Sequence, residues 1–247
     1  MTVAQELDSQ AGICQDVIFP PSDLYSDEPP VETELHLRQI ILLFKCLEWF
    51  WRDRNDFYAA GNLTIYYSPH QRKSEYFRGP DFFVVLGTDR KTRKSWVVWE
   101  EDGKYPNVIL EILSPTTANT DKEFKKELYQ NTFRTPDYFW FDPYTLEFAG
   151  FHLLDGEYQP LEANEQGHLW SKQLGLYLGV YQGLLRFFTP VGQIVPTPEE
   201  TAEQETLKAQ QETLKAQQET LRAQQAEKRA ERLAAKLREL NIDPDKI

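Results

Sequence analysis

The sequence is poor in cysteine, with only Cys14 and Cys46 among its 247 residues. Without a second pair nearby, two cysteines make neither a zinc-binding signature nor a disulfide framework. Cys46 lies within an apolar helical pattern, which favours core packing, and Cys14 lies in a segment that we expect to be a loop. This cysteine content is typical of a reducing compartment, so we predict a cytoplasmic location.

The sequence also lacks a long apolar run. Residues 1–6 do not begin a basic region followed by an apolar stretch, so we predict no signal peptide. The most apolar segment, 40–51, is interrupted by Lys45 and Glu48 and is too short to span a bilayer. We therefore expect no association with a membrane.

Positive charge is scarce, because 27 lysines and arginines accompany 39 acidic residues and the formal net charge is −12. The overall field of such a protein does not attract nucleic acid, so a nucleic-acid-binding function requires a local basic patch. Neither GxGxxG nor GxxxxGK[ST] occurs in the chain, which argues against these nucleotide-binding motifs. The histidines show no metal-binding spacing, and we expect surface or packing roles for His36, His70, His152 and His168.

The chain has enough apolar residues for a sizeable core, since 40% are hydrophobic and 13% are aromatic. Its composition predicts three segments: a polar, flexible arm over 1–30, a folded domain over 31–196, and a charged helical tail over 197–247.

Hydrophobic periodicity within the domain predicts a mixed central sheet flanked by helices, which is the α/β (α+β) class. A helix is expected over 33–54, with Thr33 as N-cap and a buried face made of Leu37, Ile40, Ile41, Phe44, Leu47 and Trp51. Short apolar runs predict strands at 62–67, 82–86, 95–99, 108–113 and 138–141, and a second helix is expected over 121–133. Shorter β-type segments after Pro143 predict a β-rich extension of the same core.

The tail contains three consecutive heptads, at 206–212, 213–219 and 220–226. A strict seven-residue period predicts a helix that repeats one face, here lined by Leu207, Leu214 and Leu221. The other seam position is glutamine, so the pattern indicates either a solvated helix or a weak coiled coil.

Three charged residues form a candidate site. Asp81 stands at the start of a predicted buried strand, Glu111 is the one charged residue of another, and Lys125 lies on the helix that follows it. A lone carboxylate in an apolar strand costs several kcal/mol unless it is paired or binds a metal. Two carboxylates can hold Mg²⁺ or Mn²⁺, and a nearby lysine can orient a water and offset charge on a phosphate. The alternative is a purely structural ion pair.

These residues lie in a series of motifs that resembles the Uma-two family of putative restriction endonucleases, a branch of the PD-(D/E)XK nuclease superfamily. The resemblance covers roughly residues 30 to 195. It rests on Gly79-Pro80-Asp81, on Ile109 to Pro115 (ILEILSP), on Asp121, Lys125 and Tyr129 at four-residue steps, and on Pro136 to Pro143 (PDYFWFDP).

The resemblance implies a restriction-endonuclease-like fold and a Mg²⁺-dependent DNA endonuclease, with Asp81 and Glu111 as metal ligands and Lys125 as the catalytic lysine. The superfamily's lysine normally follows the acidic residue by two positions, where this chain has Leu113. The resemblance places the lysine on the following helix instead, where Lys122 and Lys126 are alternatives to Lys125. It also marks Glu34 as an accessory acidic residue on the first helix.

A basic cluster flanks Asp81 in the sequence, comprising Arg72, Lys73, Arg78, Arg90, Lys91, Arg93 and Lys94. We predict phosphate contacts for it, the alternative being a solvated hairpin tip. Because cutting two strands takes two sites, a homodimer paired through the heptads is a further hypothesis. The alternative functions are a catalytically silent DNA- or protein-binding module and a structural scaffold.

Overall fold

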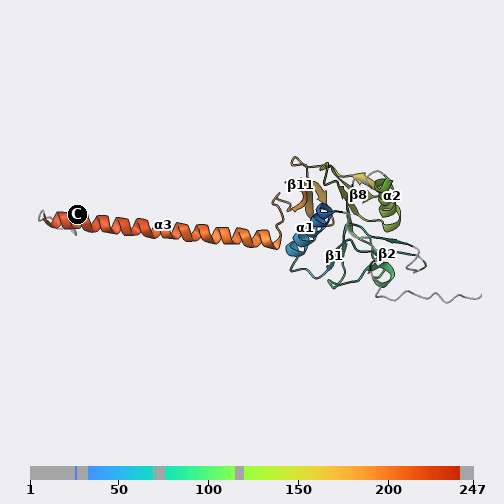
Figure 1. Ribbon diagram of the computed structural model, residues 1–247, viewed down its shortest axis with the longest axis horizontal. Helices are drawn as coiled ribbons and strands as arrows, with labels where there is room; N and C mark the ends of the chain where they lie inside the picture. Colours follow the sequence, from blue (N-terminus) through green and yellow to red (C-terminus); the bar gives the residue numbers. More distant parts are fainter. Residues whose placement is uncertain (1–25, 27–32, 69, 71–75, 115–119, 240–247) are drawn as a thin grey trace, which may run out of the picture. The chain divides into compact units, whose positions relative to one another are not determined.

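The computed structural model describes residues 26, 33–68, 70, 76–114 and 120–239, and the side chains of 120–122 are not included (Figure 1). The chain divides into two compact units, Met1–Val195 and Pro196–Ile247. Apart from Ser26, the arm predicted over 1–30 lies outside the described residues, and so do Cys14, Arg72 and Lys73.

A six-stranded mixed sheet forms the centre of the first unit, in the order β1-β4-β6-β7-β8-β9. Only β6 and β7 pair in parallel, and every other neighbouring pair in this sheet is antiparallel. Its strands are β1 (Phe57–Gly61), β4 (Phe82–Leu86), β6 (Val108–Ile112), β7 (Asp137–Phe141), β8 (Phe148–Leu154) and β9 (Glu157–Pro160). The predicted mixed sheet flanked by helices is therefore confirmed.

The two faces of this sheet bury different elements (Figure 1). One face packs against helix α1 (Glu34–Phe50) and a second sheet of β10 (Leu169–Ser171), β11 (Leu176–Tyr181) and β12 (Leu184–Phe188). The other face packs against α2 (Thr120–Leu128), the π-turn η2 (Tyr129–Phe133) and a small sheet of β2 (Ile65–Tyr66), β3 (Phe77–Arg78) and β5 (Trp96–Val97). The 3₁₀ turn η1 (Val98–Glu100) follows β5.

Helix α1 begins as predicted, since the Thr33 side chain accepts a hydrogen bond from the His36 amide. Its predicted buried face is wrong in part: Leu37, Ile41 and Phe44 are exposed, and the buried positions are His36, Gln39, Ile40, Leu43, Cys46 and Leu47. The buried face is therefore rotated about the helix axis relative to the predicted one. The Gln39 side-chain amide donates a hydrogen bond of 2.9 Å to the Leu185 carbonyl and accepts one of 3.0 Å from the Leu185 backbone amide. This polar contact with β12 turns a polar side chain inward.

The strands at 82–86, 108–113 and 138–141 lie close to where the apolar runs predicted them. The segments at 62–67 and 95–99 are shorter strands than expected, and β1 occupies a Phe-Tyr-Ala-Ala-Gly segment that propensity did not mark. Because β1 is paired along its whole length with β4, tertiary pairing overrides its weak local preference.

The β-rich extension after Pro143 forms polar contacts with the central sheet at Asp137, the fully buried first residue of β7. Its carboxylate accepts hydrogen bonds from the Ser171 hydroxyl at 2.7 Å and from the Gln173 backbone amide at 3.0 Å. The other carboxylate oxygen lies 2.7 Å from His152 Nδ1. These contacts satisfy a buried charge and connect β7, β8 and β10.

The second unit contains a single described helix, α3 (Pro198–Glu239), in which no residue is buried. It begins with a capping box, because the Glu200 amide donates to Thr197 Oγ1 and the Thr197 amide donates to Glu200 Oε2. Leu207, Leu214 and Leu221 are about half exposed. Among the described helices, none is both long and apolar enough to cross a membrane.

Candidate active site

The register of the central sheet brings two carboxylates together. Phe82 pairs with Leu110 and Phe83 with Ile109, so the next position outward sets Asp81 against Glu111. Side chains alternate along a strand, so Glu111 points to the same face as Ile109, which is the face that packs against α2. The Glu111 side chain is only 2% exposed and Asp81 is 13% exposed.

The Asp81 carboxylate is held by two elements. One oxygen, Oδ2, accepts a hydrogen bond of 2.6 Å from the Ile112 amide of β6. The other, Oδ1, lies 2.9 Å from His36 Nε2 of α1. The hydrogen bond from Ile112 and the close approach of His36 both restrict the Asp81 side chain.

The Glu111 carboxylate is held from the opposite side by α2 and its π-turn. The Tyr129 hydroxyl donates a hydrogen bond of 2.6 Å to Oε1, and the Lys125 ammonium donates one of 3.1 Å to Oε2. Lys125 and Tyr129 are four residues apart, so they lie on one side of the helix. Tyr129 begins the π-turn, a geometry that often marks functional positions in helices.

Burial raises the pKa of the Glu111 carboxyl to about 7. The Lys125 charge opposes this shift, the nearby Asp81 carboxylate adds to it, and the Tyr129 hydrogen bond opposes it. Burial also raises the pKa of Tyr129 well above 10, so its hydroxyl remains a hydrogen-bond donor. The site thus concentrates negative charge that a proton or a cation would neutralise.

The donor set fits a Mg²⁺ ion that keeps most of its waters. Such ions bind proteins through one or two carboxylates, and here Glu111 lies in β6 and Asp81 directly before the adjacent strand β4. Among the described residues no group of three or more His, Cys, Asp or Glu side chains could hold a metal ion.

The structure brings Asp81, Glu111 and Lys125 together, and it separates the accessory candidates from them. Glu34 is 75% exposed and forms an ion pair of 2.7 Å with Arg38. The Lys126 ammonium lies 3.8 Å from the centre of the Phe151 ring, while the side chain of Lys122 is outside the described residues. Of the three candidate lysines, Lys125 is the one with a described contact to Glu111.

The contact between His36 and Asp81 was not anticipated: His36 is buried, and its Nε2 lies 2.9 Å from Asp81 Oδ1. The signal was present in the sequence: His36, Gln39, Ile40, Leu43 and Leu47 recur at helical spacing. Two residues of this face, His36 and Gln39, are polar, so hydrophobic periodicity alone does not predict that the face is buried.

Phosphate contact by the basic cluster stays a prediction, and the structure gives Arg90 and Arg93 carboxylate partners within the protein. The Arg93 side chain is only 5% exposed, donates to Glu101 Oε2 at 2.9 Å, and stacks on Tyr58 and Trp96. Arg90 forms an ion pair with Glu48. The nearly buried Arg93 charge would be costly without a partner, whereas the Arg90 side chain is 28% exposed.

The cluster is also divided in space. Arg90 lies beyond the end of β4 that is remote from Asp81. There the Arg90 backbone amide donates to the Asn55 carbonyl, and the Gly87 backbone amide donates to the Asp56 carbonyl. Lys91 and Lys94 are exposed in the same loop, whereas Arg78 lies only three residues before Asp81. Of the described cluster members, Arg78 is therefore the one that the chain places next to the carboxylates.

The family described as "Uma2: Putative restriction endonuclease" matches residues 24–185. The chain belongs to this family. The match spans Asp81, Glu111 and Lys125 and ends within β12, so the Uma2 region corresponds to the first unit without α3.

Among solved structures, this Uma2 chain is similar to a putative nuclease belonging to DUF820 from Anabaena variabilis ATCC 29413. The identity is 14% and the TM-score is 0.43, over 60% of this chain and 76% of the other. The comparison with curated proteins found no match.

The raised pKa of Glu111 predicts a pH-dependent difference in stability between the wild type and Glu111→Gln, measured by urea unfolding in EDTA. The pKa is about 7 in the folded protein against 4.5 in an exposed carboxyl, so the folded state binds the proton more tightly. The free energy of unfolding of the wild type should therefore fall relative to the variant as the pH rises from 4.5 to 7, by about 2–3 kcal/mol.

Glu34→Gln is the matched control, because Glu34 is exposed and its removal should give no such trend. Parallel stability curves for the wild type and Glu111→Gln would contradict the assignment of a buried, proton-binding carboxyl.

Proposed function

We propose that this protein is a metal-dependent DNA endonuclease that hydrolyses phosphodiester bonds with Mg²⁺ or Mn²⁺. The observation that supports it is the proximity of Asp81, directly before β4, to Glu111 in the adjacent strand β6, with the Lys125 ammonium 3.1 Å from Glu111. Membership in the Uma2 family supports the same reaction. The cytoplasmic location remains a prediction from the cysteine content.

Each residue of the site has a distinct role in this proposal. Asp81 and Glu111 would hold the metal, which when bound polarises a phosphate oxygen and lowers the pKa of a coordinated water. Lys125 would orient the attacking water and offset negative charge that develops on the phosphate. His36 and Tyr129 position the two carboxylates, and the Ile112 amide holds Asp81 Oδ2.

The Glu111–Lys125 contact is also what a structural scaffold would contain, and a silent binding module would keep the same fold. Metal dependence separates these alternatives, because only the enzyme requires both carboxylates for turnover. A DNA-binding module would tolerate Asp81→Ala, and a scaffold would respond to Glu111→Gln in stability alone.

Calorimetric titration of Mn²⁺ into the wild type and the Asp81→Ala/Glu111→Ala variant tests the metal site. We expect binding to the wild type that the double variant loses, together with Mn²⁺-dependent cleavage of duplex DNA by the wild type alone. If the wild type binds no metal, even with duplex DNA present, the enzymatic proposal is wrong and a module or scaffold is left.

A second prediction concerns the lysine. Lys125→Ala should lower the cleavage rate by about 10²–10³-fold, the usual effect of removing one group that stabilises developing charge. Lys126→Ala is the matched control, because that neighbouring ammonium contacts the Phe151 ring. Equal cleavage rates for Lys125→Ala and the wild type would remove Lys125 from the mechanism.

We also propose that the chain forms a homodimer, since cleavage of both strands takes two sites and α3 repeats one leucine face. Replacing Leu207, Leu214 and Leu221 by glutamine keeps the helix but removes that face, because glutamine is a good helix former. Sedimentation should then show monomers where the wild type shows dimers. A dimer that survives the three substitutions would exclude the heptads as its interface.

A further inference from the structure

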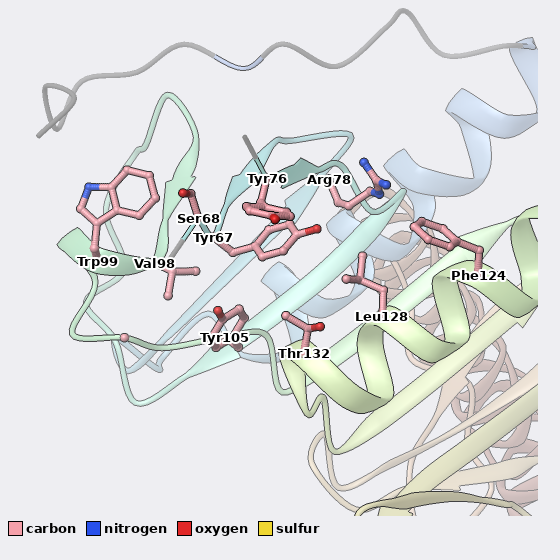
Figure 2. Close-up of a pocket in the computed structure, with 11 residues that line it drawn as sticks. Tyr67, Ser68, Tyr76, Arg78, Val98, Trp99, Tyr105, Phe124, Leu128 and Thr132 are labelled. Carbon is pink, nitrogen blue, oxygen red and sulfur yellow. The ribbon is translucent and has the colours of Figure 1, made fainter. Parts of the chain in front are cut away.

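A cavity of about 820 Å³ opens between α2 and the small β3-β2-β5 sheet (Figure 2). Its volume lies within the range of small-molecule sites, roughly 300–1,000 Å³. The strand side contributes Tyr67, Tyr76 and Arg78, while Phe124 and Leu128 come from α2. None of the roles assigned above uses this cavity.

The cavity wall is rich in aromatic rings and has a cation. Five aromatic residues line it, Tyr67, Tyr76, Trp99, Tyr105 and Phe124, and Arg78 is the charged residue. The Arg78 guanidinium lies 5.2 Å from the centre of the Phe124 ring. Among the lining residues that the structure describes there is no carboxylate, although the chain as a whole is strongly acidic.

This combination of groups is suited to one kind of ligand. Aromatic faces stack on the flat rings of nucleobases, and a guanidinium can stack on a base or bind the adjoining phosphate. Burial raises the pKa of the Tyr67 and Tyr105 hydroxyls, so both remain protonated and can donate hydrogen bonds to a base edge. A purely aliphatic ligand would leave the cation and these hydroxyls unused.

The cavity and the carboxylates share helix α2. Phe124 and Leu128 of α2 and Thr132 of η2 line the cavity at four-residue steps. Lys125 and Tyr129, which directly follow Phe124 and Leu128, contact Glu111. Arg78 is likewise separated from Asp81 only by Gly79 and Pro80. A base in the cavity and its backbone phosphate near the carboxylates would therefore belong to neighbouring parts of one strand.

We propose that this cavity receives an unpaired nucleobase of the strand that is cut, so that the preferred substrate is single-stranded or locally unpaired DNA. The inference rests on the proposed nuclease function only for the position of the cut. A base inside a regular duplex is stacked on both sides and cannot enter without being turned out of the helix, which costs free energy. Mismatched or single-stranded positions avoid most of that cost.

The test is binding of a short oligodeoxynucleotide that contains one 2-aminopurine, followed by fluorescence anisotropy and 2-aminopurine emission. Binding is measured in EDTA and again with Ca²⁺, for the single strand, its perfect duplex, and a duplex with the 2-aminopurine mismatched. We expect the single strand and the mismatched duplex to bind at least about tenfold more tightly than the perfect duplex, with changed emission from stacking.

Two exposed positions of the cavity make suitable variants. Tyr76 is 47% exposed and Phe124 is 52% exposed, so Tyr76→Ala and Phe124→Ala should fold and yet lose single-strand affinity by on the order of tenfold each. Phe124→Tyr should retain affinity because the ring remains. Tyr144→Ala is the matched control, because Tyr144 is 52% exposed and lies outside the cavity.

Several outcomes would overturn the inference. These are an absence of single-strand binding in both buffers, equal affinity for the perfect duplex, or alanine variants that bind like Tyr144→Ala. Deoxyadenosine monophosphate that binds the cavity as tightly as the oligonucleotide would assign it to a free nucleotide instead. If the strand binds as expected but is not cut with Mg²⁺ or Mn²⁺, the nuclease proposal fails while the base-binding cavity stands.

Discussion

The buried carboxylate of Glu111 is the constraint on which the site depends. An ionised carboxylate inside an apolar strand is unstable unless hydrogen bonds or opposite charge compensate for its lost hydration. Tyr129 and Lys125 supply that compensation from α2, at 2.6 and 3.1 Å. Since a second carboxylate, Asp81, lies close by just before β4, the compensation is incomplete and the pKa of Glu111 remains raised.

The fold supports this arrangement from both faces of the sheet. On one face, α1 lies so close to β1 that a Cβ on Gly61 would overlap Ile40, and His36, one turn earlier, meets Asp81. On the other face, the π-turn after α2 begins at Tyr129 and closes with Arg134 in the left-handed conformation. Buried polar contacts join α1 to β12 at Gln39 and β7 to β10 at Asp137.

Local patterns predicted the centre of the sheet well, because β4, β6 and β7 are continuous apolar runs buried on both faces. The same reasoning identified Asp81 and Glu111, since a charge at the edge or in the middle of such a run stands out. It failed for the rotation of α1, where Gln39 faces inward because its amide bonds to β12, far away in the sequence. It also did not identify the partners of Arg90 and Arg93, because Glu48 and Glu101 were not apparent from composition.

By itself, the sequence determined which segments are buried strands, which carboxylates are anomalous, and which family the chain belongs to, because each of these depends on residue types at short spacing. Only the tertiary structure decided which charged groups are already paired, since ion pairs form between segments distant along the chain. In the folded chain, Lys125 hydrogen-bonds to Glu111, whereas the neighbouring Lys126 lies over the Phe151 ring. Folding also places His36 beside Asp81. It also created the aromatic cavity, because strands and a helix must pack before their rings enclose a space.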